Sequence, residues 1–450
     1  MRVGVFFDGT GNNLANSVTA APCFAPGFDL RTAPEAVRCL CARLGYDEQG
    51  NTPQDSYGND KSNVACLYEL YQARAGEPLL KVYVQGIGTT AGEPDAALSM
   101  LTGRHALGIG ARVRWAQEEL VRQLNAWQAA NPDRRIDVLE FDLFGFSRGA
   151  AAARHFANDL AKGAGSRFSA LYPGPKRSWL INFIGLFDTV AAVVAAHRAD
   201  FSPADDRNAG LELALPTGIA RKVVQLVARD EWRHNFALTR TDNDIEVPGA
   251  HADVGGGYLP RMREVLLLTR PHSCEQALRL ADEHSQAYTR ARDEHQRNQA
   301  QWVQWNLQTQ VVSWSQALSY VPKRDLYPCK QVFAAVRGER WVEGGLSRVY
   351  LQLMRELGMA HDVPFAALGT QPSLQAPQAL QGIATRLLGF ALGHTGSPGL
   401  GAEEEGLLRQ RYIHHSSHWN AARHPAGNVL DAVYIHRPHE TGRRMRHDNA

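Results

Sequence analysis

The chain has 450 residues, of which 44% are hydrophobic and 21% are charged, as in ordinary globular proteins. This length predicts about two or three domains, or one large domain with insertions, and the composition excludes a disordered regulator. The 48 basic and 46 acidic side chains sum to a net charge of +2, so no overall field favours nucleic acid as a partner.

The first expected strand covers residues 3–7 and ends in a turn rich in Gly and Asn at residues 8–13. Residues 14–60 contain many Pro, Gly, Asn and Asp residues, which favour turns over regular structure. We therefore expect an insertion loop over 14–60, with a short helix near 34–44.

Beyond the insertion, apolar strand-like runs alternate with patterns of helical period. Such alternation predicts a largely parallel sheet with helices on both faces, and assigns residues 1–262 to one α/β domain. The expected elements are a helix at 62–71, a strand at 79–84, a helix at 112–129, a strand at 136–144, a helix at 150–160, a strand at 179–187, a helix at 223–236 and a strand at 245–247.

The pattern changes at the end of this domain. Residues 275–310 form a long polar helical pattern, and residues 380–390 form one apolar helix. We expect residues 263–450 to form a mostly helical C-terminal cap or lipid-access region, with a last strand near 429–435 and a frayed end over 441–450.

Trp302, Trp305 and Trp314 lie near the end of the polar pattern and, with the apolar helix, leave two interpretations open. Aromatic rings and an apolar stripe can lie at a bilayer interface, at the level of the headgroups. The same side chains can instead pack on the core of the α/β domain.

Six cysteines in a chain of this length are too sparse for a disulfide scaffold. Cys39 and Cys41 form a C-x-C pair without a second pair, which supports zinc only weakly; the alternative is two structural thiols. The first residues lack the apolar run of a signal peptide, and the most apolar stretch, residues 183–196, is too short to span a bilayer. We expect a chain that is made in the cytoplasm.

Residues 145–149 read G-F-S-R-G, a match to the G-x-S-x-G nucleophile elbow. A hydrophobic strand leads into this segment and a helix of small residues leads out, as the elbow requires. The serine must stand on a sharp turn so that its hydroxyl projects, and the two glycines avoid collisions with the strand and the helix. Ser147 is therefore the predicted nucleophile.

A nucleophilic serine needs a base, and the base needs an orienting acid, in the chain order Ser, Asp or Glu, His. Asp188 follows an apolar strand at its carboxyl end, where the sites of parallel sheets collect, and is the predicted acid. His251, in a glycine-rich loop after another short strand, is the predicted base. His414 or His415 is the alternative base, and Asp253 the alternative acid.

The oxyanion that forms during acyl transfer needs two backbone N–H donors. The geometry of the elbow supplies the N–H of Arg148, the residue after the nucleophile. The N–H of Gly9 or Thr10, in the turn after the first strand, is the predicted second donor, and the turn at 85–89 is the alternative.

Five motifs together resemble one known family, the bacterial type VI secretion phospholipase effectors with an α/β-hydrolase domain. Their order makes the resemblance specific, and it covers about residues 1–260. It implies an α/β-hydrolase fold with Ser147, Asp188 and His251 as the triad, whereas the 14–60 insertion is longer than expected for the family's first loop. The motifs are F-D-G-T-G-N at 7–12, G-F-S-R-G-A at 145–150, F-D-T-V at 187–190, D-E-x-R at 230–233 and G-x-H-x-D-V-G-G-G at 249–257.

The resemblance implies a serine esterase of the phospholipase A type that cleaves acyl esters of glycerophospholipids in the envelope of a rival bacterium. It also implies an immunity protein in the producing cell, a secretion-spike or adaptor partner, and delivery into the periplasm of the target cell. A soluble carboxylesterase or thioesterase acting on small acyl groups is the alternative. We expect no metal, no cofactor and no nucleic-acid partner.

Overall fold

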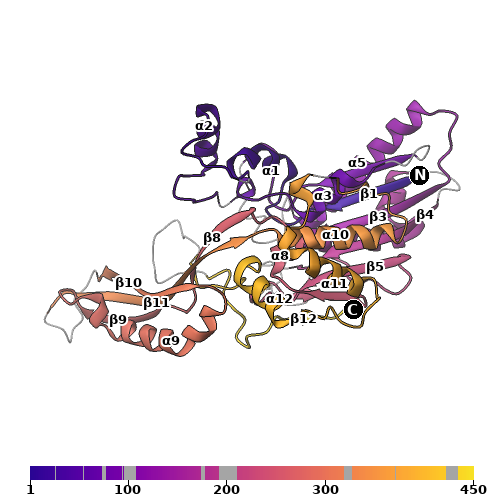
Figure 1. The fold of residues 1–450 in the computed structure, drawn as a ribbon. Coiled ribbons are helices and arrows are strands. Elements are labelled where there is room, and N and C mark those ends of the chain that lie inside the picture. Colours follow the sequence, from indigo (N-terminus) through magenta and orange to yellow (C-terminus); the bar gives the residue numbers. More distant parts are fainter. Residues whose placement is uncertain are drawn as a thin grey trace.

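The structure is a computed structural model, and it describes residues 1–25, 27–53, 55–72, 78–93, 95, 108–173, 178–191, 210–318, 327–369, 371–421 and 434–449. A six-stranded sheet forms its centre, in the order β2-β1-β3-β4-β5-β7. Its strands are β1 (Arg2–Phe7), β2 (Leu79–Val84), β3 (Val138–Phe146), β4 (Ser178–Phe187), β5 (Lys222–Ala228) and β7 (Asp244–Val247). Every pairing along this sheet is parallel, which confirms the expected α/β architecture (Figure 1).

Helices cover both faces of the sheet. Because alternate side chains of a strand point to opposite faces, Val5 and Phe7 of β1 belong to one apolar layer and Phe6 to the other. The first layer contains α5 (Ile109–Ala130) and α6 (Arg148–Ala161), and the second contains α3 (Asn63–Leu70), α10 (Leu346–Met359) and α11 (Gln381–Ala391).

The division predicted at residue 262 does not separate two cores. α10 comes from the region after it, and yet its buried Val349 belongs to the same apolar cluster as Phe144 of the sheet. α11 joins this cluster through Leu387, which is fully buried. The C-terminal region therefore returns to the α/β domain and completes its second layer.

Between the sheet and α10 the chain forms an arm that projects from the domain (Figure 1). The arm is an antiparallel sheet with one helix packed on it, so this part of the expected helical cap is largely strand. Its elements are β8 (Arg261–Leu267), β9 (His272–Ala277), α9 (Gln286–Val303), β10 (Gln308–Ala317) and β11 (Cys329–Glu343).

Of two predicted helices, the one at 275–310 is confirmed only over α9 and the one at 223–236 is wrong, for related reasons. The pattern at 275–310 includes the polar strands β9 and β10, which lack the alternation of apolar and polar residues that marks a strand. The segment at 223–236 begins with β5, whose last five residues are all buried, and a short apolar run of this kind has no period that distinguishes it from a helix. The other elements predicted before residue 262 are confirmed closely.

The tryptophans and the apolar helix pack on the protein rather than facing outward. Trp302 and Trp305 are each only 7% exposed and belong to the main apolar cluster. Trp314 stacks on Phe333 with 5.8 Å between ring centroids. Among the described residues, no helix combines the length and the apolar character that crossing a bilayer requires.

The end of the chain is held by the domain. β12 (Arg446–His447) pairs in parallel with β6 (Leu238–Thr239), and the Asn449 side chain exchanges two hydrogen bonds with the backbone of Leu215. The expectation of a frayed end is therefore wrong for residues 441–449. Most of the strand predicted near 429–435 lies outside the described residues.

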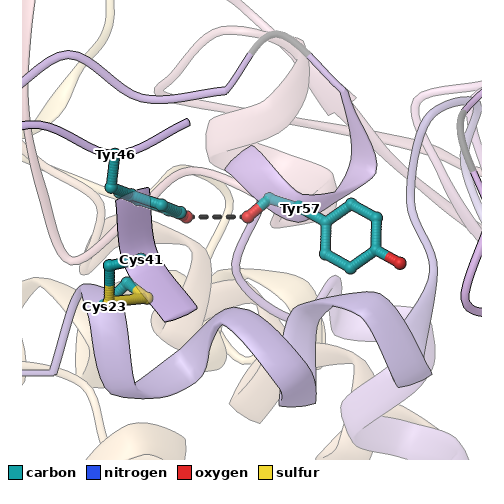
Figure 2. Close-up of a disulfide and its surroundings, with 4 residues drawn as sticks. All are labelled: Cys23, Cys41, Tyr46 and Tyr57. Carbon is teal, nitrogen blue, oxygen red and sulfur yellow. Dashed lines mark hydrogen bonds between the residues drawn. A yellow bond between two sulfur atoms is a disulfide. The ribbon is translucent and has the colours of Figure 1, made fainter. Parts of the chain in front are cut away.

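A disulfide joins Cys23 to Cys41 inside the insertion (Figure 2). This bond corrects the interpretation of Cys39 and Cys41 as two thiols or a zinc pair, since Cys39 is free and exposed. The bond fastens the second half of α2 (Glu35–Leu44) to the turn after α1 (Leu14–Ala20).

The disulfide lies in a small core of its own. Cys23 and Cys41 cluster with Ala20, Tyr46 and Leu259, apart from the two layers of the sheet. The Tyr46 hydroxyl donates a hydrogen bond to the Tyr57 carbonyl oxygen at 2.7 Å, which closes the far end of the insertion (Figure 2). The insertion is thus a separately cross-linked unit.

Candidate active site

Ser147 stands on the turn between β3 and α6, as the sequence predicts. Its φ of 57° and ψ of −126° are values that side chains rarely adopt, so the turn is strained as in a nucleophile elbow. Its N–H donates to the carbonyl oxygen of Phe187 at 3.0 Å, which fixes the turn against the end of β4.

The two glycines of the elbow are required by close contacts. A Cβ at Gly145 would lie 2.6 Å from the Cα of Ala150, and a Cβ at Gly149 would lie 2.3 Å from the carbonyl oxygens of Phe7 and Asp8. The second contact also shows that the turn after β1 packs directly against the start of α6.

Asp188 and His251 come together at the carboxyl end of the sheet. Asp188 follows β4 with a φ of 47°, and its Oδ2 lies 2.5 Å from Nδ1 of His251, the first residue of α8 (His251–Gly255). A carboxylate only accepts hydrogen bonds, so Nδ1 carries the proton and Nε2 of the neutral ring is left as the basic atom.

The charges around this pair keep both groups in the states that a catalytic acid and base would need. Burial alone would raise the pKa of Asp188, but the Arg444 guanidinium and the hydrogen bond from His251 outweigh it and hold that pKa well below the ordinary value. Burial lowers the pKa of His251, despite the opposing effect of Asp188. At neutral pH the acid is therefore charged and the base is neutral.

The ring of His251 lies beside the elbow. Its centroid is 4.7 Å from that of Phe146, the residue before Ser147, and 5.0 Å from that of Phe236. Both Ser147 and His251 are described, and the structure contains no hydrogen bond between the serine hydroxyl and the ring. Catalytic hydrogen bonds of this kind often close only when the substrate binds.

The D-E-x-R motif holds the backbone of His251, the predicted base. Glu231 is fully buried and accepts a hydrogen bond from the His251 N–H at 3.3 Å. Burial opposes its charge, but the ion pair with Arg233 lowers the pKa of Glu231 to about 2. A permanent charge is thus available to fix the first turn of α8.

The alternative base and the alternative acid contact each other instead of the elbow residues. Nδ1 of His414 lies 2.6 Å from Oδ1 of Asp253, and the His414 ring stacks on Tyr258 with 3.6 Å between centroids. Its Nε2 is buried without a hydrogen-bond partner in the part of the chain that the structure describes. The other alternative, His415, has its Nδ1 2.9 Å from the carbonyl oxygen of Ser417.

Of the predicted oxyanion donors, two are open. The Gly9 N–H donates to the carboxylate of Asp8 at 2.7 Å and is therefore engaged. The N–H groups of Thr10 and Arg148 have no acceptor among the described residues. Burial raises the pKa of Asp8 to about 6, against the hydrogen bond from the Tyr83 hydroxyl and others.

The Arg148 side chain is a cation without a partner. Its guanidinium makes no hydrogen bond or ion pair with any described residue, and its Nη1 is buried. Burial lowers its pKa to about 10, which still leaves the group charged at neutral pH. A partly buried cation that no described group pairs, next to the predicted nucleophile, can bind an anionic group of another molecule.

No metal site is evident in the described ranges, where no three His, Cys, Asp or Glu side chains are arranged to hold an ion. The two aspartates of the glycine-rich turns are already engaged. Asp8 accepts from Tyr83 and Gly9, and Asp253 accepts from Ala250 and the His414 segment.

Arg444 could not be found from the sequence. It lies 256 residues from Asp188, in a segment whose composition suggests a frayed end. The pairing of β12 with β6 and the backbone contacts around it bring it to the site, and neither strand is long enough to leave a pattern.

No protein-family model matches the sequence, and no curated protein matches it. Among solved structures, the chain is similar to that of the Tle1 effector bound to the VgrG spike from the type 6 secretion system, with 25% identity over 99% of this chain and 93% of that chain and a TM-score of 0.71. An uncharacterized protein from Pseudomonas aeruginosa is 18% identical over 90% of this chain and 52% of that chain, and its TM-score of 0.40 is too low to support an argument. This likeness along 99% of the chain agrees with the resemblance of its motifs to the type VI secretion phospholipase effectors.

Proposed function

We propose that the protein is a serine esterase of the phospholipase A type, with Ser147 as nucleophile, His251 as base and Asp188 as acid. The observation that carries the proposal is the 2.5 Å contact between Asp188 and His251 beside the strained turn of Ser147. A strained serine, a neutral imidazole and a buried carboxylate in this chain order are the parts of an acyl-transfer site.

In the proposed reaction, His251 Nε2 takes the hydroxyl proton while Ser147 Oγ bonds to the acyl carbonyl carbon. The N–H groups of Arg148 and Thr10 hold the oxyanion. The ester C–O bond then breaks, and His251 gives its proton to the leaving glycerol oxygen, so that a lysophospholipid departs. Water attacks the acyl-enzyme in the same way, with His251 as base, and the fatty acid and free Ser147 result.

Arg148 favours a phospholipid over a neutral ester. A guanidinium binds phosphate through paired, charge-assisted hydrogen bonds, and this one starts from the residue next to the nucleophile. In a glycerophospholipid the phosphate and the acyl esters are attached to one glycerol. An ester placed at Ser147 therefore brings an anionic group close to a cation that has no partner among the described residues.

The distal end of the arm is suited to contact a lipid surface. Leu278, Leu280 and Tyr327, here called the arm tip, are 47%, 43% and 59% exposed. The Leu278 N–H donates to the Pro328 carbonyl oxygen at 2.8 Å, which joins the two segments, and the Arg279 guanidinium lies 5.4 Å from the Tyr327 ring. Apolar and aromatic groups flanked by a cation are typical of interfacial binding.

Hydrolysis of phospholipid vesicles by the purified chain, with products resolved by mass spectrometry, tests the enzymatic proposal. We expect fatty acid and lysophospholipid from the wild type and neither from Ser147→Ala, whose fold should persist because a single hydroxyl contributes little to packing. A fluorophosphonate probe should label Ser147. Labelling of another serine would overturn the nucleophile, and activity only on short soluble esters would favour a carboxylesterase or thioesterase.

The role of the arm tip is tested by the double variant Leu278→Ser/Tyr327→Ser. We expect a lower rate on vesicles and an unchanged rate on a short-chain ester in solution, because only the first substrate needs docking to a surface. Val18→Ser removes an equally exposed apolar side chain, 50% exposed, from the insertion and is the matched control. Equal rates of double variant and control on vesicles would exclude this role.

We further propose that a secretion spike delivers the protein into the periplasm of a target cell and that an immunity protein protects the producer. Two observations support this: the similar Tle1 effector is bound to the VgrG spike, and the Cys23–Cys41 disulfide suits an oxidising compartment. Expression in a susceptible bacterium with and without an added secretory signal peptide tests it. We expect toxicity only with the signal peptide; equal harmlessness in both compartments would contradict the proposal.

A further inference from the structure

The carboxylate of Asp188 is bound by an arginine, Arg444, that takes no part in the proposed reaction. Arg444 donates from Nη1 to Oδ1 at 2.6 Å and from Nη2 to Oδ2 at 2.8 Å. Its Nε donates to the carbonyl oxygen of Phe236 at 2.6 Å. The two side chains are 4% and 0% exposed, so the ion pair is shielded from water.

Residues 434–449, here called the C-terminal strap, place this arginine. The strap runs along residues 232–240: the His234 N–H donates to Arg437, the Leu238 N–H to Met445 and the Arg240 N–H to His447, each to a carbonyl oxygen at 2.9 Å. The same segment carries Phe236, whose ring packs against His251. One strap therefore contacts the acid directly and supports a neighbour of the base.

The hydrogen bonds on Asp188 define the orientation of its carboxylate. Oδ1 accepts from Arg444 and from the Ala228 N–H at 3.0 Å, whereas Oδ2 accepts from Arg444 and His251. A bidentate guanidinium fixes the plane of a carboxylate as well as its distance. Without it, the carboxylate can turn about its side-chain bond, and the position of Oδ2 under the imidazole is no longer enforced.

From these contacts we infer that Arg444 is a positioning residue of the triad, which holds Asp188 so that Oδ2 meets Nδ1 of His251, an inference that rests on the proposed function. A cation so close to the acid also has an electrostatic cost. It offsets part of the negative charge that stabilises the protonated imidazole during the reaction.

The loss of Arg444 should therefore act in two ways. Misorientation of the acid lowers kcat, since small misplacements of catalytic groups cost up to about a hundredfold. Removal of a nearby positive charge favours the protonated ring, so the pKa of His251 rises and the acid limb of the kcat/KM profile moves to higher pH. The other charged groups that face the pair, Glu231 and Arg233, stay in place and set the remaining field.

The experiment compares Arg444→Met with Arg443→Met, which removes the neighbouring, exposed arginine of the same strap. We expect Arg444→Met to lose about ten- to a hundredfold in kcat with little change in KM, and its acid limb to move upward. Arg443→Met should keep the wild-type values. Arg444→Lys keeps the charge without the bidentate geometry. Its kcat/KM profile should have the acid limb at the wild-type pH, but its kcat should stay below that of the wild type.

A readout without substrate separates this inference from the proposed function. The low-field proton resonance of the His251 Nδ1–H, assigned by its absence in His251→Ala, should shift in Arg444→Met and stay in Arg443→Met. If the wild type hydrolyses no ester, the proposed function fails and the resonance alone decides the inference. If Arg444→Met keeps the wild-type kcat, pH profile and resonance, the inference is overturned. If Arg444→Met does not fold, Arg444→Lys is measured in the same way.

Discussion

The described part of the chain holds two buried histidine–aspartate pairs, Asp188 with His251 and Asp253 with His414, and their nitrogen–oxygen distances are 2.5 and 2.6 Å. The pairs differ in what else the carboxylate holds. Asp188 accepts a hydrogen bond from the ring of His251 but not from its backbone N–H, which Glu231 binds instead. Asp253 accepts from both the ring and the backbone N–H of its histidine.

The second pair joins distant parts of the chain. Asp253 also accepts from the Ala250 N–H at 2.9 Å, so one carboxylate ties the start of α8 to the segment of His414. That segment is fastened again by the buried Arg340, which donates to the carbonyl oxygens of Arg409 and Ile413. A ring held at so many points and stacked on an aromatic neighbour is suited to a structural clamp.

Contact between a histidine and an aspartate does not by itself identify a catalytic base. The two pairs are distinguished by the neighbours of the ring. His251 lies against Phe146, the residue before the nucleophile, while His414 lies against Tyr258 and keeps its Nε2 buried. From these neighbours we expect the pair of Asp188 and His251 to serve ester hydrolysis and the pair of Asp253 and His414 to serve stability.

The largest expected effect separates the two histidines. His251→Ala should lower kcat for ester hydrolysis by about 10⁴-fold or more, because no other described group is placed to take the serine proton. His414→Ala should leave most of kcat and lower the free energy of unfolding instead. Steady-state kinetics and urea unfolding of both variants check this. If His414→Ala is the inactive variant, the C-terminal segment supplies the base.

The two aspartates should differ in the same way as the two histidines, one affecting activity and the other stability. Asp188→Asn should lower kcat by about 10⁴-fold, because an amide no longer holds the required tautomer of His251. Asp253→Asn should lower the free energy of unfolding by about 1–3 kcal/mol, because two N–H groups and a ring lose a charged acceptor. Circular dichroism shows whether each variant is folded. A stable, inactive Asp253→Asn would move the acid to the second pair.

The positions of Ser147 and Asp188 could be predicted from the sequence because their signals are local. The elbow needs glycines at fixed offsets, and Asp188 directly follows an apolar strand, so both positions can be identified within short segments. The sequence predicts a helix in place of the strand β5 because a buried run has no diagnostic period, although Val223, Val224 and Val227 favour a strand.

The rest depends on contacts between distant segments, which leave no local pattern. Both His414 and Arg444 reach their aspartates from the C-terminal region, across 161 and 256 residues. The Cys23–Cys41 disulfide could not be foreseen either, because spacing alone does not fix which cysteines pair. Strands β9 and β10 of the arm are polar and lack the alternation that marks a strand, so their sequences are not distinguished from the helix between them.

An intermediate effect concerns Arg148, which follows Ser147 in the chain and whose side chain has no partner among the described residues. Arg148→Met keeps the backbone N–H of the oxyanion site but removes the cation. We expect kcat/KM to fall by about ten- to a hundredfold on phospholipid, the worth of one or two charge-assisted hydrogen bonds, and to change little on a neutral short ester. Equal losses on both substrates would mean that Arg148 supports the elbow and does not bind phosphate.

The smallest effect is a shift in pH dependence, and it also tells the pairs apart. The base must be unprotonated to act, and an ordinary histidine would halve the activity at about pH 6.5. Because burial lowers the pKa of His251, the acid limb of kcat/KM should have its midpoint below that value. The profiles of wild type and His414→Ala, measured on a short neutral ester, should coincide. A midpoint above about 6.5 would contradict a buried base, and a limb that moves in His414→Ala would show that the second pair shares in the chemistry.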